Sequence, residues 1–254
     1  MDSLTTPGSI LGEGVTDREV ANVKVAETLH EWDVDYARAR AIQEELAARV
    51  VLEPLPRRVR WVAGADMALS KTDRAFVAAV VVLSFPALEV VEEVIGRALA
   101  SFPYIPGLLS FREAPAVADA LRRVQRRADV ILFDGQGLAH PRRLGLASHV
   151  GLWLGLPAVG AAKSRLIGEH PEPGEHKGDW TPLLDRGEQI GSVLRTRTGV
   201  KPLYVSPGHL CDHAGARRIV LECCTRYRLP EPTRRAHNAV SRARARPAGP
   251  FTTV

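Results

Sequence analysis

Apolar residues along the chain recur first at helical spacing and then in strand-like runs. Between Asp33 and Val50 they alternate with charged residues near a helical period, which predicts an amphipathic helix. Three β-branched runs follow at Trp61–Ala68, Phe76–Phe85 and Leu88–Ile95, separated by charged or proline-containing turns. Because short turns join them, these strands are predicted to form an antiparallel meander.

The next part of the chain alternates between helix and strand. Arg112–Arg127 carries apolar side chains on one face and arginines on the other, as expected for a helix packed on a sheet. Predicted strands at Asp129–Phe133 and Pro157–Ala162 enclose a predicted helix at Leu144–Leu154. This order favours parallel neighbours added to the meander. We therefore predict the α/β class, with a mixed central β-sheet flanked by helices on both faces.

The last third of the chain adds strands and helices after a polar stretch. Residues 167–185 are polar and rich in proline and glycine, which predicts a long surface excursion. Two strands are expected at Gln189–Thr196 and Pro202–Ser206. Two helices are expected at about 213–227 and 231–245, the second introduced by prolines.

Composition indicates one globular domain with arms. The chain has 254 residues, 45% hydrophobic and 25% charged, which is enough apolar material for one sizeable core. We predict a single domain at 28–245, a mobile arm at 1–27 and a disordered tail at 246–254. The longest apolar run, Ala75–Leu88, is interrupted and shorter than the roughly 18 to 20 residues of a membrane span. With no secretory signal pattern at the N-terminus, we expect a soluble, cytoplasmic monomer.

The net charge indicates which binding partners are possible, and the cysteines indicate the redox state of the compartment. The net charge is +5, and nine arginines lie between Arg217 and Arg246 against two acids, which predicts a basic surface near the C-terminus. Such a surface permits binding to polyanions without demonstrating it. Cys211, Cys223 and Cys224 show neither zinc-ligand spacing nor a matched second pair. We expect reduced thiols, in keeping with a cytosolic setting.

The stretch Ser101–Glu113 mixes residue types that a core would not combine. Pro103 and Pro106 flank Tyr104 and Ile105, and each proline restricts its own backbone and that of the preceding residue. The result is a stiff projecting aromatic, followed by a glycine that permits a tight turn. An aromatic beside an acid suggests that a flat group is gripped close to a place where charge is handled.

Three carboxylates are candidates for chemistry. Asp66 and Asp134 occur in otherwise apolar strands, and Glu113 stands at the start of the predicted helix. A buried carboxylate needs compensation, for which a divalent cation is one means and a strand-end Asx turn is another. If the three converge at one end of the sheet, they supply hard oxygen ligands for Mg²⁺ or Mn²⁺. Such a site suits phosphodiester hydrolysis.

Other residues near these acids allow two interpretations each. Lys163, at the end of an apolar strand, would add a positive charge for phosphate or remain solvated. His237 would be a ligand or proton carrier, or a surface histidine. Glycines at 135 and 137 would let main-chain amides approach a base or phosphate, or would simply make a turn. In His140-Pro141-Arg142-Arg143 the arginines would contact a nucleic-acid backbone or solvent.

These residues also resemble the endonuclease V family, the deoxyinosine 3′-endonucleases. The resemblance covers about residues 30–240 and rests on five segments: VAGADMA (62–68), PYIPGLLSFRE (103–113), FDGQGLAHPRRLGLASHVGLWLGLPAVGAAKSRLIG (133–168), SPGH (206–209) and YRLPEPTRRAH (227–237). It implies an RNase H-like fold and Mg²⁺-dependent cleavage, with Mn²⁺ able to substitute, at the second phosphodiester bond 3′ to a hypoxanthine nucleotide. The implied partners are double- and single-stranded DNA containing inosine, and RNA in addition.

The resemblance also implies roles for individual residues. Asp66, Glu113 and Asp134 would be metal ligands, Lys163 would contact phosphate or water, and His237 would complete the catalytic centre. Pro103, Tyr104, Ile105 and Pro106 would form a wedge that fills the space left by a rotated base. Gly107, Leu108, Gly135, Gly137 and His140 would line a hypoxanthine pocket.

Three hypotheses of function remain after the sequence is read. The first is a metal-dependent endonuclease acting in DNA repair on inosine-containing DNA. The second is a nuclease of the same fold acting mainly on inosine in RNA or on mismatched and branched DNA, because a contact to the 2′-hydroxyl need not leave a sequence signature. The third is a non-catalytic nucleic-acid binder, against which the complete set of three acids argues.

Overall fold

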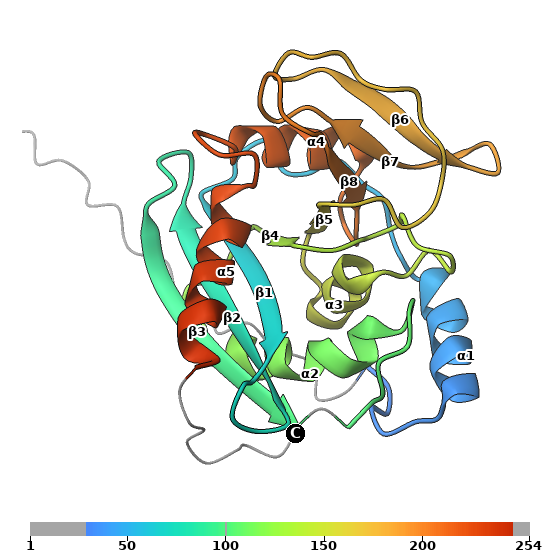
Figure 1. The fold of residues 1–254 in the computed structure, drawn as a ribbon, viewed down its shortest axis with the longest axis vertical. Coiled ribbons are helices and arrows are strands. Elements are labelled where there is room, and N and C mark those ends of the chain that lie inside the picture. The colour runs from blue at the N-terminus through green and yellow to red at the C-terminus, as the bar shows by residue number, and fades with distance from the viewer. Residues whose placement is uncertain (1–28, 100, 246–254) are drawn as a thin grey trace, which may run out of the picture.

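The computed structural model describes residues 29–99 and 101–245, so the predicted arm at 1–27 and tail at 246–254 lie outside the described residues. Its centre is an eight-stranded sheet in the order β3-β2-β1-β4-β5-β8-β7-β6 (Figure 1). The strands are β1 (Trp61–Leu69), β2 (Ala75–Ser84), β3 (Val90–Leu99), β4 (Val130–Phe133), β5 (Ala158–Ala162), β6 (Trp180–Asp185), β7 (Glu188–Leu194) and β8 (Leu203–Pro207). The helices are α1 (Tyr36–Ala47), α2 (Leu109–Leu121), α3 (Leu146–Leu154), α4 (His213–Glu222) and α5 (Glu231–Ala243).

The sheet is mixed, as predicted. β1, β2 and β3 form the expected antiparallel meander, while β4 pairs in parallel with β1, and β5 in parallel with β4. The far side of the sheet is antiparallel, from β5 through β8 and β7 to β6. The short meander turns and the longer helical crossovers account for this division, since parallel neighbours need a crossover connection.

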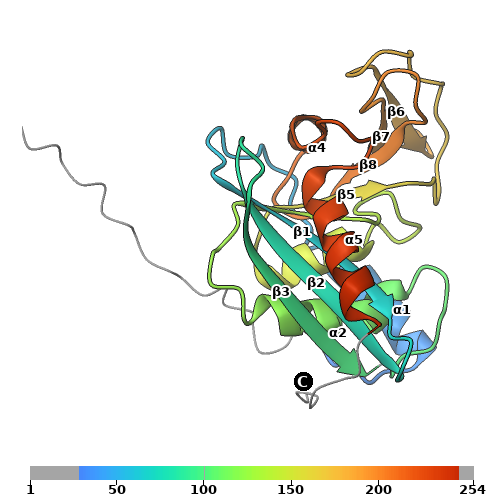
Figure 2. The same ribbon diagram turned by 60° about the vertical axis from the view of Figure 1, so that its left-hand side comes forward.

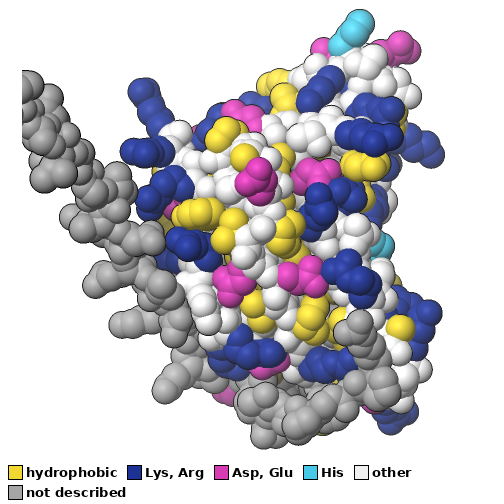
Figure 3. Space-filling view, turned by 90° about the vertical axis from the view of Figure 1, so that its left-hand side faces the viewer, with side chains coloured by type: hydrophobic (Ala, Val, Ile, Leu, Met, Phe, Trp, Pro, Cys, Tyr) yellow, Lys and Arg dark blue, Asp and Glu magenta, His cyan; other side chains and the backbone are white. Residues whose placement is uncertain are grey.

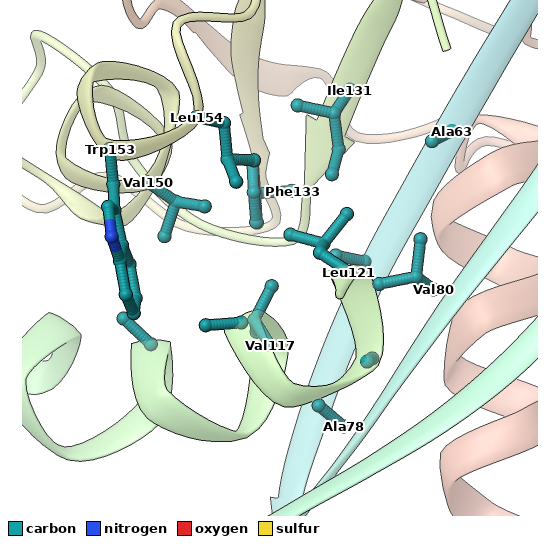
Figure 4. Close-up of a cluster of buried hydrophobic side chains, with 14 of the residues drawn as sticks. Ala63, Ala78, Val80, Val117, Leu121, Ile131, Phe133, Val150, Trp153 and Leu154 are labelled. Atoms are coloured by element: carbon teal, nitrogen blue, oxygen red, sulfur yellow. The ribbon is translucent and has the colours of Figure 1, made fainter. Parts of the chain in front are cut away.

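Helices cover both faces of the sheet (Figure 2). On one face, α2 and α3 bury their apolar sides against the strands, and Val117, Val150 and Phe133 meet in this core (Figure 4). On the other face, α4 and α5 pack over β1, β4, β5 and β8 through a second apolar cluster. The prediction of helices on both faces is confirmed, and burial of two opposite faces explains why the central strands are almost continuously apolar.

Some predicted boundaries differ from the structure. The expected surface excursion at 167–185 ends in a strand, β6, which forms one edge of the sheet and is half exposed. An exposed edge strand needs few apolar residues, so its polar composition concealed it. The helix expected at 112–127 begins earlier, at Leu109, so that Glu113 lies in its second turn. The helix expected at 213–227 ends at Glu222.

The basic C-terminal stretch is partly neutralised by acids. Glu231 pairs with Arg234 and Arg235, and Arg242 pairs with Glu93 of β3. On the face that carries β3 and α5, basic and acidic side chains are intermixed with apolar ones (Figure 3). The arginine excess therefore does not make this face uniformly basic. Within the described residues no helix is long and apolar enough to cross a membrane.

Glycine permits close contact between α5 and β1. A Cβ atom at Gly64 would lie 2.1 Å from the main-chain carbon of Pro232, well inside van der Waals contact. The start of α5 therefore lies directly on β1. His237 follows five residues further along α5, and Asp66 two residues further along β1, so this contact brings these two side chains together.

Hydrogen bonds to one main-chain carbonyl group, that of Gly107, fix the loop before α2. Gly107, whose φ of +80° suits glycine, presents a carbonyl oxygen that accepts three hydrogen bonds. The donors are Nε2 of Gln43 at 3.0 Å, Nε2 of His140 at 3.0 Å and Nη2 of Arg142 at 2.8 Å. Phe102 and Leu108 anchor the two ends of the loop in an apolar cluster with α1. The Tyr104 side chain between these anchors is 67% exposed.

His140 must be neutral to hold this loop. Its Nε2 donates to the Gly107 carbonyl, and its Nδ1 accepts from the Arg142 main-chain N–H, so Nδ1 carries no proton. Burial, reinforced by the charge of Arg142, lowers the pKa of His140 from 6.5 to about 4. Protonation would replace the acceptor at Nδ1 with a donor facing another donor.

We predict that Gly64→Ala destabilises the fold by about 1–3 kcal/mol, because the added methyl group displaces the start of α5. Urea unfolding followed by circular dichroism measures the free energy of unfolding. Gly135→Ala is the matched control, since its Cβ would lie 3.7 Å from Cδ2 of Leu146, an ordinary contact. Equal stability of Gly64→Ala and wild type would contradict the close contact.

We predict that His140 makes stability fall as the pH is lowered. Between pH 6.5 and about 4 the unfolded chain binds a proton at this histidine that the folded chain does not, so the free energy of unfolding declines by about 1.4 kcal/mol per pH unit. Other groups titrate in the same range, so the measured quantity is the difference between wild type and His140→Gln. A pH-independent difference in urea unfolding would contradict a neutral folded-state His140.

Candidate functional site

Strand pairing places two acids side by side. In the parallel pair of β1 and β4, Ala65 lies opposite Phe133. Asp66 comes directly after Ala65, and Asp134 comes directly after Phe133. Because the two strands are parallel, both acids lie at the same end of the pair. β5 is parallel to β4 and ends just before Lys163, which brings a positive charge to the same region. The Lys163 ammonium donates a hydrogen bond to Oδ2 of Asp134.

Asp66 lies between a histidine and a second carboxylate. Its Oδ2 is 2.9 Å from Nδ1 of His237, so His237 presents its protonated Nδ1 to Asp66. The Asp66 side chain is 13% exposed and that of His237 is 55% exposed. Burial, with a further contribution from the charge of Asp134, raises the pKa of Asp66, while the hydrogen bond from His237 opposes the rise.

Glu113 is the third acid of the group. It projects from the second turn of α2, on the face of the sheet opposite α5. Burial, followed by the charge of Asp66, raises the pKa of Glu113 to about 7, against the opposing effect of Arg112. No donor among the described residues makes a hydrogen bond to this carboxyl group. Asp66 and Asp134 follow paired positions of β1 and β4, and Glu113 and Asp134 line the same cavity, so the three acids are neighbours. The charge of Asp66 acts on Glu113, and that of Asp134 acts on Asp66.

A cavity of about 390 Å³ lies beside this group. Residues of the loop before α2, the turn after β4 and the turn after β5 line it. The lining comprises Gln43, Tyr104, Pro106, Gly107, Leu109, Ser110, Glu113, Asp134, Gly135, Gln136, His140, Leu144, Gly145, Leu146, Ala162, Lys163, Ser164, Arg165 and Leu166. This volume is in the range of small-molecule and base-sized pockets.

The structure brings most of the predicted residues to this cavity. Tyr104, Pro106, Gly107, Glu113, Asp134, Gly135, His140 and Lys163 all line it, and Asp66 and His237 join the acid group next to it. Pro103 and Ile105 belong to the same loop. Leu108 instead is fully buried against α1 and Phe111, and Gly137 packs on the main chain of Pro207. These two residues shape the loops behind the cavity.

The two arginines of the HPRR motif bind within the protein. Arg142 donates to the carbonyl of Gly107 and to Gln43. Arg143 donates to the carboxylates of Asp185 and Glu188 at 2.7 and 3.0 Å. Neither side chain is therefore simply solvated, and a contact of either one to a nucleic-acid backbone stays a prediction.

Several lining residues were not singled out from the sequence. Gln43 is 1% exposed, and it is the one polar member among the four buried residues of α1. A polar residue on the apolar face of a predicted helix was the available signal for it. Ser110 in the first turn of α2 and Arg165 after β5 carry no such signal, because these segments meet only in the folded chain.

The acids are suited to a divalent cation, though their side chains are engaged with neighbours. As they stand, no three His, Cys, Asp or Glu side chains of the described residues are close enough to hold one metal ion. Asp66 contacts His237 and Asp134 contacts Lys163, while the buried carboxyl of Glu113 has its ionised form disfavoured by Asp66. Carboxylate oxygens are the donors that hard cations prefer, so the chemistry of these three side chains suits such an ion.

Comparison with known proteins identifies the family of the chain. The family model for Endonuclease V matches residues 44–238. An Endonuclease V from Nostoc sp. is 53% identical over 213 residues, covering 84% of this chain and 96% of the relative. The crystal structure of Endonuclease V from Streptomyces avermitilis has a TM-score of 0.81 and 44% identity, covering 84% of this chain and 94% of that one.

A third likeness is to Endonuclease V from Ciona intestinalis. That structure contains a 23mer DNA with an inosine followed by a ribo-adenosine, and it matches with a TM-score of 0.73 and 29% identity over 82% of this chain and 96% of that one. The RNase H-like fold implied by the sequence segments is confirmed by these structures. Together with the family match over most of the chain, the shared fold and the grouped acids show that the protein belongs to the Endonuclease V family and is a nuclease, a hydrolase of phosphodiester bonds.

Proposed function

We propose that the protein is a divalent-metal-dependent endonuclease of DNA repair that cuts the second phosphodiester bond 3′ to deoxyinosine. The observation that carries this proposal is the group of Asp66, Glu113 and Asp134 beside a cavity of base-sized volume. The DNA containing inosine in the Ciona relative supports the same substrate. The buried, unpaired state of all three cysteines supports the cytoplasm as its site of action.

The three acids would hold Mg²⁺, or Mn²⁺ in its place. When bound, such an ion supplies activation of water and charge stabilisation at the phosphate. The acids arrive on three different elements, β1, α2 and the end of β4, so their relative positions are set by the sheet and its covering helix. The ionised form of Glu113 is the one that would bind a cation.

Two cationic or protonatable side chains flank the acids. Lys163 is 44% exposed at its side chain, so its ammonium group is accessible to a phosphate while it neutralises Asp134. His237 is oriented by Asp66 through Nδ1, which leaves Nε2 to exchange a proton with water or a leaving oxygen. Both groups would therefore act on the phosphodiester side of the site.

The cavity would enclose the displaced base, and the loop before α2 would fill the space that the base leaves. A base must leave the helical stack before a pocket can enclose it, at an energetic cost of a few kcal/mol that is least for a mispaired base such as hypoxanthine. Tyr104 is exposed at the end of a loop with two prolines, so its ring is available to stack in the vacated space. Main-chain groups of Gly107 and Gly135 line the cavity where the base would enter.

A preference for inosine in RNA is the second candidate. The nucleic acid bound to the Ciona relative carries a ribonucleotide directly after the inosine, which favours testing it. A nicking assay with inosine, uracil, abasic and normal strands, as DNA and as RNA, decides between the two. Mg²⁺, Mn²⁺ and EDTA form its metal conditions, and absence of inosine-dependent cleavage in all of them would refute the proposal.

We predict that Asp134→Asn lowers the single-turnover cleavage rate by about 10²- to 10³-fold, because it removes one charge from the acid group. Gel analysis of an inosine duplex with Mg²⁺ measures this rate. Glu53→Gln removes an exposed acid elsewhere and serves as the control. Cleavage by Asp134→Asn at the wild-type rate would contradict the assignment of the acids.

We predict a division between binding and cleavage. Tyr104→Ala weakens inosine-specific binding by about 1–3 kcal/mol, the usual contribution of one base stacked on an aromatic ring. Asp66→Ala abolishes cleavage but retains most of that binding. Fluorescence anisotropy with labelled inosine and matched control duplexes measures both, and Tyr104→Phe is the conservative control. Equal loss of specific binding in the two variants would contradict the division.

A further inference from the structure

A chain of hydrogen bonds runs from a main-chain carbonyl to the wall of the cavity. Nδ1 of His30 is 2.6 Å from the carbonyl oxygen of Glu31, and Nε2 of His30 is 2.6 Å from Nε2 of His149. Nδ1 of His149 is then 2.8 Å from the hydroxyl oxygen of Ser110, which lines the cavity. No part of the proposed catalytic chemistry uses these three side chains.

The carbonyl at one end decides the direction of every hydrogen bond. A carbonyl oxygen only accepts, so Nδ1 of His30 carries a proton and, in the neutral ring, Nε2 is the acceptor. His149 must then donate from its Nε2, which leaves its Nδ1 as an acceptor. The Ser110 hydroxyl must therefore donate its proton to His149.

The environment keeps both rings neutral. His149 is fully buried and stacks on Trp32 with 5.4 Å between ring centroids. Burial lowers the pKa of both histidines, and for His30 the charge of Arg38 adds to this effect while the carbonyl of Glu31 opposes it. A second proton on His30 would reverse the hydrogen bonds from its Nε2 to His149 and from His149 to Ser110, and the surroundings disfavour that proton.

The fixed direction determines what Ser110 offers to a ligand. Its single proton is committed to His149, so its oxygen retains only acceptor capacity on the cavity side. The Watson–Crick edge of hypoxanthine carries a donor, the N1–H group, whereas N1 of adenine is an acceptor. A fixed acceptor therefore favours the deaminated base over the normal one.

We propose that Ser110 is a specificity-determining residue that accepts a hydrogen bond from N1–H of the bound base, with His149 and His30 as positioning residues. This inference rests on the proposed function, because it assigns the base of that substrate to the cavity. It concerns discrimination against adenine. Guanine also carries N1–H and has to be rejected by other means.

Cleavage of two substrates tests the role of Ser110. Deoxyinosine has the N1–H donor, while deoxynebularine, an unsubstituted purine, has only an acceptor at N1. We expect Ser110→Ala to lower the ratio of kcat/KM for inosine over nebularine by about 10- to 100-fold, the usual effect of leaving a buried donor without its partner. Ser148→Ala, which removes a fully buried hydroxyl one residue before His149, is the control and keeps the ratio.

A second measurement does not depend on activity. ¹⁵N NMR of the histidine rings in the whole protein reports which nitrogen carries the proton. We expect a proton on Nδ1 of His30 and on Nε2 of His149. In His30→Ala, His149 should no longer be restricted to the tautomer with its proton on Nε2. A proton on Nδ1 of His149 in the wild type, or an unchanged substrate ratio in folded Ser110→Ala, would overturn the inference. If the wild type does not cut inosine strands at all, the proposed function fails, which is a separate result.

Discussion

The parallel pairing of β1 with β4 is the constraint on which the site depends. It sets two carboxylates next to each other at the same end of the sheet, where the charge of Asp134 adds to burial in raising the pKa of Asp66. Such an arrangement is electrostatically unfavourable, and neighbouring side chains oppose it: Lys163 donates to Asp134, and His237 donates to Asp66. The protein thus stores electrostatic repulsion at the place where a positively charged ligand would gain most.

The sequence predicted the elements whose burial is uniform. The strands β2 and β4 could be read because both of their faces are covered, so that nearly every residue is apolar. Asp66 and Asp134 stood out for the same reason, as acids in apolar runs. β6 was missed because it lies at an edge and faces solvent. The local pattern of apolar and polar residues therefore predicts burial well, but it predicts the position of a strand within the sheet poorly.

Contacts between distant parts of the chain could not be predicted. Gln43 meets the Gly107 carbonyl from 64 positions away, and His30 meets His149 from 119 positions away. Nothing in the local period of α1 or α3 specifies these partners. The HPRR motif is a further case: its pattern did not reveal that Arg142 donates to the Gly107 carbonyl and Arg143 to Asp185. A basic motif indicates charge, and only the fold decides what receives it.

The three donors on the Gly107 carbonyl have a consequence for the thermodynamics of recognition. A loop that had to become ordered around a displaced base would lose conformational entropy at the moment of binding. Here Gln43, His140 and Arg142 restrict the loop in the free protein, and the prolines stiffen its tip. Most of that entropy is lost during folding instead, so in the proposed role of Tyr104 the free energy of stacking would remain available to hold the nucleic acid open.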